Sequence, residues 1–274
     1  MAHDQLENTV NLLAKLVAFP TVSSDSNRPL IDFAAEMLEG LGARVRVSPD
    51  QSGAKANLFA TLGPETDGGI VLSGHSDVVP VDGQDWTSDP FLMRELDGRL
   101  FGRGTCDMKG FIAASLATAQ HYAALPLAKP VHFAFTHDEE TGCLGARALV
   151  EELRDIGMKP SACIIGEPTL MRIIEGHKGC YEYTVEFSGL AGHGSVPEAG
   201  VSAVEYAVQY VSHLMSLRQE LAQRCPPASP FDPPHTTLQV GRIAGGIAHN
   251  VIADKCSVDW EMRPVQNSDA DFVK

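Results

Sequence analysis

Several features are scarce or absent in this 274-residue sequence, and each absence argues against a class of protein. No run of apolar residues approaches the roughly 18 that indicate a membrane-spanning helix. Residues 1–20 lack a basic start and a continuous apolar segment, so they indicate an amphipathic helix and not a signal peptide. Basic residues are outnumbered, 21 against 35 acidic ones, which gives a net charge of −14. This charge disfavours nucleic acid and anionic membranes as partners.

Cysteine pairs are also missing, because the six cysteines are scattered and form no CxxC motif. Most of them lie inside apolar runs, which predicts reduced, mostly buried thiols and a cytoplasmic location. The sequence has no internal repeat and no low-complexity segment. What remains is an ordinary globular composition, 44% hydrophobic and 20% charged. A chain of this length can bury one large core or two smaller ones.

In the first part of the chain, strand-like and helix-like segments alternate. Their spacing and short connections predict an α/β fold, in which a mostly parallel sheet is flanked by helices. The predicted helices are 5–18, 29–41, 109–125 and 144–156, and the predicted strands are 43–47, 57–62, 69–74, 131–135 and 162–165.

The pattern changes near residue 178, where we place a domain boundary between 1–177 and 178–274. The second region predicts a strand, a long amphipathic helix, two more strands and the start of a helix. This β-α-β-β-α order is an α+β arrangement, a split βαβ sandwich without its final strand. The predicted segments are 180–189, 201–223, 236–243, 256–263 and 267–274.

Groups suited to metal binding follow three of the predicted strands in the first region. They are His75 and Asp77, Glu139 and Glu140, and Glu167. Ligands of open α/β sheets bind at the carboxyl ends of the strands, so we expect these side chains to converge. Asp107, in the glycine-rich segment GRGTCDMKG, precedes a predicted helix and is a further candidate. Its alternative role is to cap that helix.

Imidazole and carboxylate together are ligands that zinc accepts when thiolate is absent, and a catalytic zinc site keeps one position open for water. Asp77, two residues after His75, is placed to fix the tautomer of the imidazole. Of the adjacent Glu139 and Glu140, one is expected to bind metal and the other to take a proton from water. The alternative for this acidic turn is a solvated loop without a function.

Four segments, SGHSDVVPVDGQDWTSDPF, GRGTCDMKG, DEETG and GEPT, occur in an order that resembles one family of di-zinc metallopeptidases. This family contains acetylornithine deacetylase, succinyl-diaminopimelate desuccinylase and carboxypeptidase G. The resemblance implies a zinc-peptidase-like catalytic domain with an inserted ferredoxin-like lid and dimerisation domain. It also implies two zinc ions per complete active site, with cobalt as an alternative, and a homodimer formed through the lid domain.

The resemblance also implies roles for individual residues. His75, Asp107 and Glu167 would hold one zinc ion, while Asp107 would bridge to a second ion held by Glu140. Glu139 would be the general base, and Asp77 the carboxylate behind His75.

Three further roles belong to the second region. His193, in GHGS, matches a histidine that reaches the active site of the partner subunit and stabilises an oxyanion; its alternative is a turn residue. Asn250 and Arg263 match positions that contact polar groups of the substrate. Arg263 has the alternative of pairing with a surface acid.

Within this family, the segment from GEPT onward most resembles the acetylornithine deacetylase branch. That resemblance predicts hydrolysis of N2-acetyl-L-ornithine, an N-acyl amino acid, to ornithine and acetate in arginine biosynthesis. Desuccinylation of succinyl-diaminopimelate and a broader aminoacylase or dipeptidase activity stay open as alternatives. Nothing in the sequence matches the late histidine that binds the second zinc ion, so we expect a C-terminally truncated member. A rival of another class is an inactive fragment that binds metal and dimerises.

Overall fold

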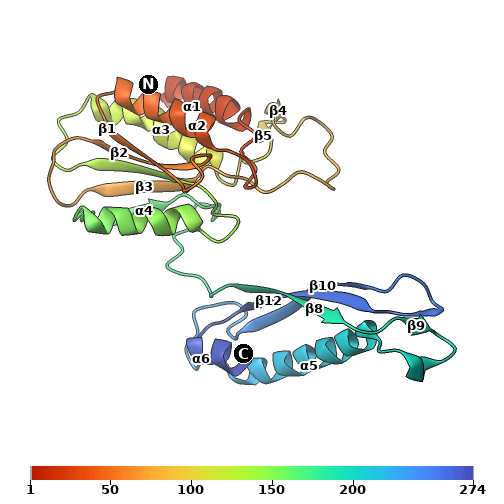
Figure 1. Cartoon of the computed structure of the whole chain (residues 1–274). Coiled ribbons are helices and arrows are strands. Elements are labelled where there is room, and N and C mark those ends of the chain that lie inside the picture. Colours follow the sequence, from red (N-terminus) through yellow and green to blue (C-terminus); the bar gives the residue numbers. More distant parts are fainter. Residues whose placement is uncertain (1, 274) are drawn as a thin grey trace. The chain divides into compact units, whose positions relative to one another are not determined.

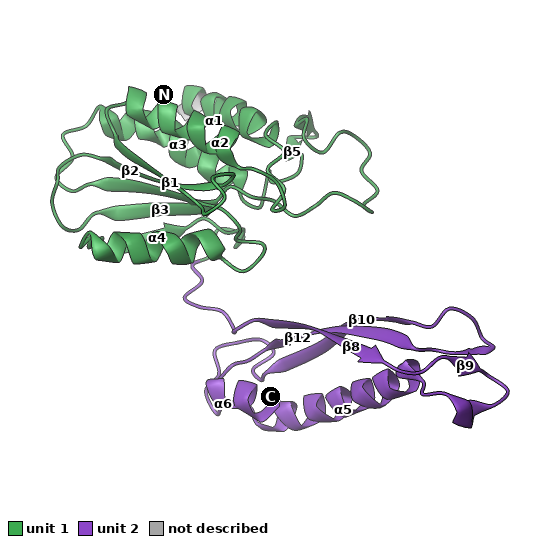
Figure 2. Ribbon diagram, viewed as in Figure 1, with its two compact units in different colours: residues 1–172 green, residues 173–274 purple. Residues whose placement is uncertain are grey.

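The computed structural model describes residues 2–273. The chain divides into two compact units, Met1–Arg172 and Ile173–Lys274 (Figure 2). The first unit is built around a five-stranded sheet, and the second around a three-stranded sheet. Among the described residues, no helix has the length and apolar character required to cross a membrane.

The first unit contains four helices and seven strands among its described residues (Figure 1). The helices are α1 (Ala2–Val17), α2 (Arg28–Gly40), α3 (Lys109–Ala123) and α4 (Leu144–Asp155). The strands are β1 (Arg44–Pro49), β2 (Ala56–Leu62), β3 (Ile70–His75), β4 (Arg94–Leu96), β5 (Arg99–Phe101), β6 (Val131–Thr136) and β7 (Ala162–Ile165). The hairpin of β4 and β5 lies in a segment for which the sequence pattern predicts neither a helix nor a strand.

The main sheet has the strand order β1-β2-β6-β3-β7. β6, β3 and β7 pair in parallel, whereas β1 and β2, and β2 and β6, pair antiparallel. The expectation of a mostly parallel sheet is therefore corrected to a mixed sheet. The reason lies in the short turn from Asp50 to Lys55, since a connection of this length joins antiparallel neighbours and is too short for a parallel crossover.

Helices cover both faces of this sheet (Figure 1). α1, α2 and α3 pack on one face, where Leu16, Leu38 and Phe133 belong to the larger hydrophobic core. α4 packs on the other face, where Leu149 belongs to a smaller cluster with Phe59. Because helices cover both sides of the sheet, every residue of β2 is buried, including the polar Asn57 and Thr61.

The second unit consists of an antiparallel sheet in the order β10-β12-β8, with α5 packed on one face. Its strands are β8 (Tyr181–Ser188), β9 (Gly192–His193), β10 (Thr237–Gly245), β11 (Val251–Ile252) and β12 (Lys255–Arg263). Its helices are α5 (Ala203–Gln223), α6 (Asn267–Val273) and a short 3-10 turn at Pro197–Ala199. Whether this unit acts as a lid or a dimerisation domain stays a prediction.

The cysteines correct one expectation. All six are free thiols, but only Cys256 is buried. Cys163 is exposed because β7 is the edge strand of its sheet, and Cys106 and Cys143 lie in exposed loops beside α3 and α4. An apolar sequence neighbourhood predicted their burial wrongly, because the burial of an edge strand depends on what packs against it.

Candidate metal centre

His75 is the last residue of β3, and its buried imidazole has two different surroundings. Its Nδ1 lies 2.9 Å from the backbone oxygen of Asp77 and 3.6 Å from Oδ1 of the same residue. Its Nε2 faces three carboxylates, 3.0 Å from Asp107 Oδ1, 3.7 Å from Glu167 Oε1 and 3.9 Å from Glu139 Oε2. Because only acceptors surround Nδ1, that nitrogen carries a proton, and Nε2, which faces the carboxylates, is the nitrogen placed to bind a metal ion in exchange for its own proton.

Two overlapping groups of possible metal ligands share this imidazole. His75, Asp107 and Glu140 form one group, and His75, Glu139 and Glu167 form the other. In each group the ligand atoms lie within 4.8 Å of one another. The structure therefore brings together all four residues proposed as metal ligands, with the proposed base beside them. Their roles stay predictions.

The donor chemistry fits a divalent cation. Burial and the charge of Asp107 raise the pKa of Glu140. Burial also raises the pKa of Glu167 to about 7, with the charges of Asp107 and Glu139 adding to the effect and His75 opposing it. Carboxylates that crowd one another in this way ionise readily only when a strong positive charge joins them. One imidazole and several carboxylate oxygens are ligands that zinc accepts.

Asp77 is buried and connects His75 to the turn that carries Glu139 and Glu140. Its side chain is 3% exposed, and it accepts hydrogen bonds from Ser23 Oγ at 2.6 Å and from the backbone N–H groups of Glu139 at 3.1 Å and Glu140 at 3.3 Å. Burial alone would raise the pKa of Asp77. The hydrogen bonds from His75, Ser23 and Glu139 outweigh this effect and lower the pKa to about 2. Burial lowers the pKa of His75, but Asp77 and the carboxylates of Glu167 and Glu139 raise it to about 9.

Asp107 does not cap α3. The cap position is Met108, and it makes no side-chain capping bond. The carboxylate of Asp107 is half-exposed and lies beside His75 instead. Of its two predicted roles, the structure therefore agrees with the placement at the site and contradicts the capping role.

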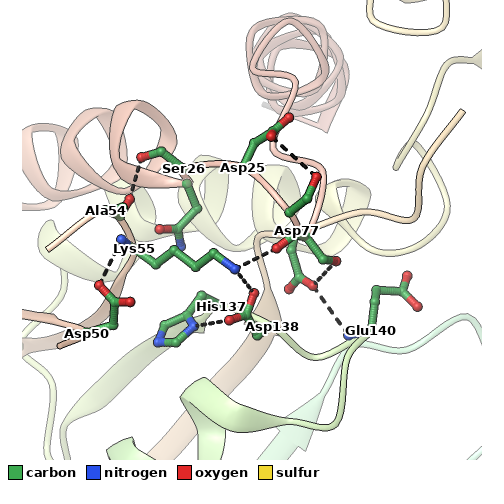
Figure 3. Close-up of polar contacts among 12 residues, drawn as sticks. Asp25, Ser26, Asp50, Ala54, Lys55, Asp77, His137, Asp138 and Glu140 are labelled. Carbon is green, nitrogen blue, oxygen red and sulfur yellow. Dashed lines mark hydrogen bonds and ion pairs between the residues drawn. The ribbon is translucent and has the colours of Figure 1, made fainter. Parts of the chain in front are cut away.

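The acidic turn after β6 is not a uniform solvated loop. Asp138 is buried and lies 2.5 Å from Lys55 Nζ (Figure 3), while Glu139 and Glu140 belong to the groups of possible metal ligands. Sequence reasoning missed Ser23, Lys55 and Asp138 as parts of this region. The available signal was weak: a lysine directly before a buried strand, and a third acid beside the two glutamates.

His193 and Asn250 are neighbours in the second unit. β9 pairs with β11 so that His193 lies opposite Val251, and Gly194 N–H donates to Asn250 O at 2.8 Å. A cavity of about 720 Å³ adjoins this pair, with Gly194 and His249 among its lining residues.

Arg263 lies at the opposite end of β12 from the Asn250 turn. It pairs with Glu261 at 2.9 Å, as its alternative interpretation stated. The structure therefore brings His193 and Asn250 together, but it does not place Arg263 beside them.

Comparison with known proteins decides the family. The sequence model of the family "Peptidase family M20/M25/M40" matches residues 71–274 of this chain. The chain belongs to this family. Acetylornithine deacetylase from Pasteurella multocida (strain Pm70) is 38% identical over 270 residues, which cover 96% of this chain and 69% of the relative. Acetylornithine deacetylase from Edwardsiella ictaluri (strain 93-146) is 39% identical over 268 residues, with 95% of this chain and 69% of the relative covered.

Two solved structures, one of them from the M20 family, share the fold of this chain. The metallo-carboxypeptidase Sso-CP2 from Sulfolobus solfataricus superposes with a TM-score of 0.76 at 17% identity, covering 93% of this chain and 71% of that one. The di-peptidase Dug1p from Saccharomyces cerevisiae gives a TM-score of 0.70 at 16% identity, covering 99% and 72%. M20 enzymes are hydrolases that bind two metal ions, and the ligand groups around His75 are the candidate site for them in this chain.

Proposed function

We propose that this protein is a zinc-dependent amidohydrolase that removes the acetyl group from N2-acetyl-L-ornithine, giving ornithine and acetate. The observation that carries the proposal is the convergence of His75 and four carboxylates at the strand ends of an M20 fold. The choice of substrate is supported by relatives that are 36–39% identical and are named acetylornithine deacetylase.

Zinc held by His75, Asp107, Glu140 and Glu167 would supply a Lewis acid that polarises the amide carbonyl and acidifies water. Asp77 fixes the His75 ring through Nδ1 and accepts the backbone N–H groups of the acidic turn. The chain thereby orients both the imidazole and the two glutamates before a substrate binds.

Glu139 is the proposed general base. Its carboxylate takes a proton from the attacking water and later returns it to the leaving amine. It is about one-third exposed, so water and substrate can reach it. Its backbone N–H is anchored on Asp77, which keeps the side chain next to His75.

His193 is proposed to stabilise the oxyanion in the active site of a partner subunit, in a homodimer formed through residues 178–274. The backbone N–H of Ser195 donates to His193 Nδ1 at 3.2 Å, so Nδ1 is an acceptor and Nε2 carries the proton. An exposed Nε2–H is a suitable donor to a developing negative charge. Asn250 and Arg263 are proposed to bind polar groups of the substrate.

The substrate proposal is tested by measuring acetate release from N2-acetyl-L-ornithine by the zinc-loaded protein. Succinyl-diaminopimelate and a set of N-acetyl amino acids and dipeptides are assayed in parallel. Preference for acetylornithine supports the proposal, and preference for another substrate class reassigns the protein within the M20 family. A protein that binds zinc and hydrolyses none of these substrates supports the inactive-fragment alternative.

A further inference from the structure

A largely buried lysine, Lys55, contacts the acidic turn of the metal centre. Lys55 precedes β2, and its backbone is fixed by Asp50: Asp50 N–H donates to Lys55 O at 2.9 Å, and Lys55 N–H donates to Asp50 Oδ1 at 3.1 Å. Its side chain, 18% exposed, leaves the turn and reaches inward. The ammonium donates to Ser23 O and to Asp138 Oδ1, both at 2.5 Å (Figure 3).

Asp138 determines the direction in which the acidic turn presents its side chains. Its backbone is left-handed, with φ at 55°, and its carboxylate is buried between Lys55 Nζ and His137 Nδ1, which lies 3.1 Å away. The two following residues, Glu139 and Glu140, reach the other side of the turn and belong to the metal-ligand groups. The ion pair with Lys55 therefore anchors the residue from which both glutamates extend.

Ser23 is the second segment held by Lys55. Its carbonyl accepts from the ammonium, its N–H donates to Val78 O at 3.1 Å, and its hydroxyl donates to Asp77 Oδ2 at 2.6 Å. Lys55 therefore joins two segments that both end on Asp77. One reaches Asp77 through the Ser23 hydroxyl, and the other through the backbone N–H groups that follow Asp138.

We propose that Lys55 is a positioning residue of the metal centre, which holds the turn of Glu139 and Glu140 and the Ser23 loop in the geometry that binds the metal ion. This inference rests on the proposed function, because it assigns Lys55 a role toward the proposed metal site. Without the ammonium, Asp138 would be a buried anion with only His137 beside it. Removing one partner of a buried pair leaves an uncompensated charge, which a shift of the turn toward water would relieve.

If Lys55 acted only through its charge, its removal would change zinc affinity in the opposite direction. Lys55 is a positive charge close to the proposed cation site, so its removal would strengthen the attraction for zinc. If Lys55 acts by positioning, its removal weakens zinc binding despite the more favourable charge. The direction of the change therefore separates the two explanations.

The test measures zinc affinity of the full chain by competition with a chromogenic chelator. Lys55→Met is expected to weaken zinc binding about 10–100-fold, as loss of a supporting contact behind a metal ligand does. Lys129→Met is the matched control, because Lys129 also donates to a backbone carbonyl, that of Asp67 at 2.8 Å, but lies in an exposed loop. The control is expected to leave zinc affinity unchanged.

Two further measurements distinguish a loss of positioning from a general folding defect. The visible spectrum of the Co²⁺-loaded protein reports ligand geometry and is expected to change in Lys55→Met but not in Lys129→Met. Lys55→Met/Asp138→Asn removes both charges, so it avoids the buried anion. If the ion pair positions the turn, the double variant folds and binds zinc more weakly than the wild type, because nothing fixes the Ser23 carbonyl and residue 138, but it loses no more zinc affinity than Lys55→Met.

Two results would overturn the inference. One is unchanged or tighter zinc binding by folded Lys55→Met, and the other is a double variant whose loss of zinc affinity equals the product of the losses that Lys55→Met and Asp138→Asn show when each is measured as a single variant. If Lys55→Met does not fold, the double variant decides, since wild-type zinc affinity in that protein contradicts a positioning role. Failure of the proposed function looks different. In that case the wild-type chain binds no zinc, or binds it and hydrolyses no N-acyl amino acid.

Discussion

Replacing Asp77 by Asn tests the support behind His75 most severely, because the change keeps the shape and removes the charge. Every polar neighbour of the two carboxylate oxygens is a donor: Ser23 Oγ, the Glu139 and Glu140 N–H groups and the His75 Nδ1. An amide has only one accepting oxygen. Whichever way the Asn side chain turns, one backbone N–H of the acidic turn meets an NH₂ group.

The cost follows from these contacts. A buried N–H group left without an acceptor costs about 1–3 kcal/mol. The pKa of Asp77 falls from 3.8 to about 2, which corresponds to about 2 kcal/mol of stabilisation of its charged form. The two quantities overlap, because the same hydrogen bonds produce both. We therefore expect Asp77→Asn to lower the free energy of unfolding by about 2–4 kcal/mol.

The assay is urea unfolding of the metal-free protein at several pH values, with a zinc titration alongside. Asp155→Asn, at an exposed position at the end of α4, is the matched control. Because the pKa of Asp77 is depressed in the folded state, its contribution is present above about pH 4 and is lost as the pH falls toward 2. Zinc affinity is expected to fall about 10–100-fold. Unfolding free energy and zinc affinity equal to those of the control would refute the reasoning.

Three other changes probe separate parts of the account. Glu139→Gln is expected to lower turnover of acetylornithine about 100-fold or more while zinc stays bound, measured by acetate release and elemental analysis; turnover within a few-fold of wild type contradicts its role as base. Gly166→Ala would place a Cβ 1.9 Å from the ring of Phe111, so we expect about 1–3 kcal/mol of destabilisation in urea; no change would show that Phe111 can move aside. Burial raises the pKa of Asp269, but its bonds from Thr236 and Arg224 lower it, so its stabilisation is present above about pH 4 and is lost at lower pH. At pH 7 we expect Asp269→Asn to lower the free energy of unfolding in urea by about 1–3 kcal/mol and to flatten this acid dependence, and an unchanged pH profile would contradict the prediction.

The sequence predicted the convergence of the metal-ligand candidates well. This convergence depends mainly on the direction of the strands and less on their order in the sheet. β3, β6 and β7 are parallel, so their carboxyl ends meet at one edge of the sheet. His75 ends β3, while Glu139 follows β6 and Glu167 follows β7. Identifying the three strands was therefore sufficient to group the side chains, even though the rest of the sheet is antiparallel.

The supporting residues were beyond the reach of sequence patterns. Lys55 and Asp138 are 83 residues apart, and Ser23 and Asp77 are 54 apart. No periodicity links such positions, and each residue alone is an ordinary surface type. Only the fold shows that the start of β2 and the loop after α1 lie behind the acidic turn.

The antiparallel pairing of β1 and β2 was predictable from the length of the connection between them. Only six residues, Asp50 to Lys55, separate the segments that become β1 and β2. The exposure of Cys163 was not predictable in the same way. It depends on β7 being an edge strand, which an apolar sequence does not reveal.

X-ray absorption at the zinc edge of the purified, zinc-loaded protein tests the central claim most directly. The account predicts a first shell of oxygen and nitrogen atoms at about 2.0–2.2 Å with the outer-shell scattering of an imidazole, and the imidazole signal should disappear in His75→Gln. A sulfur neighbour at about 2.3 Å, or an imidazole signal that persists in His75→Gln, would place the zinc on other residues and contradict the account.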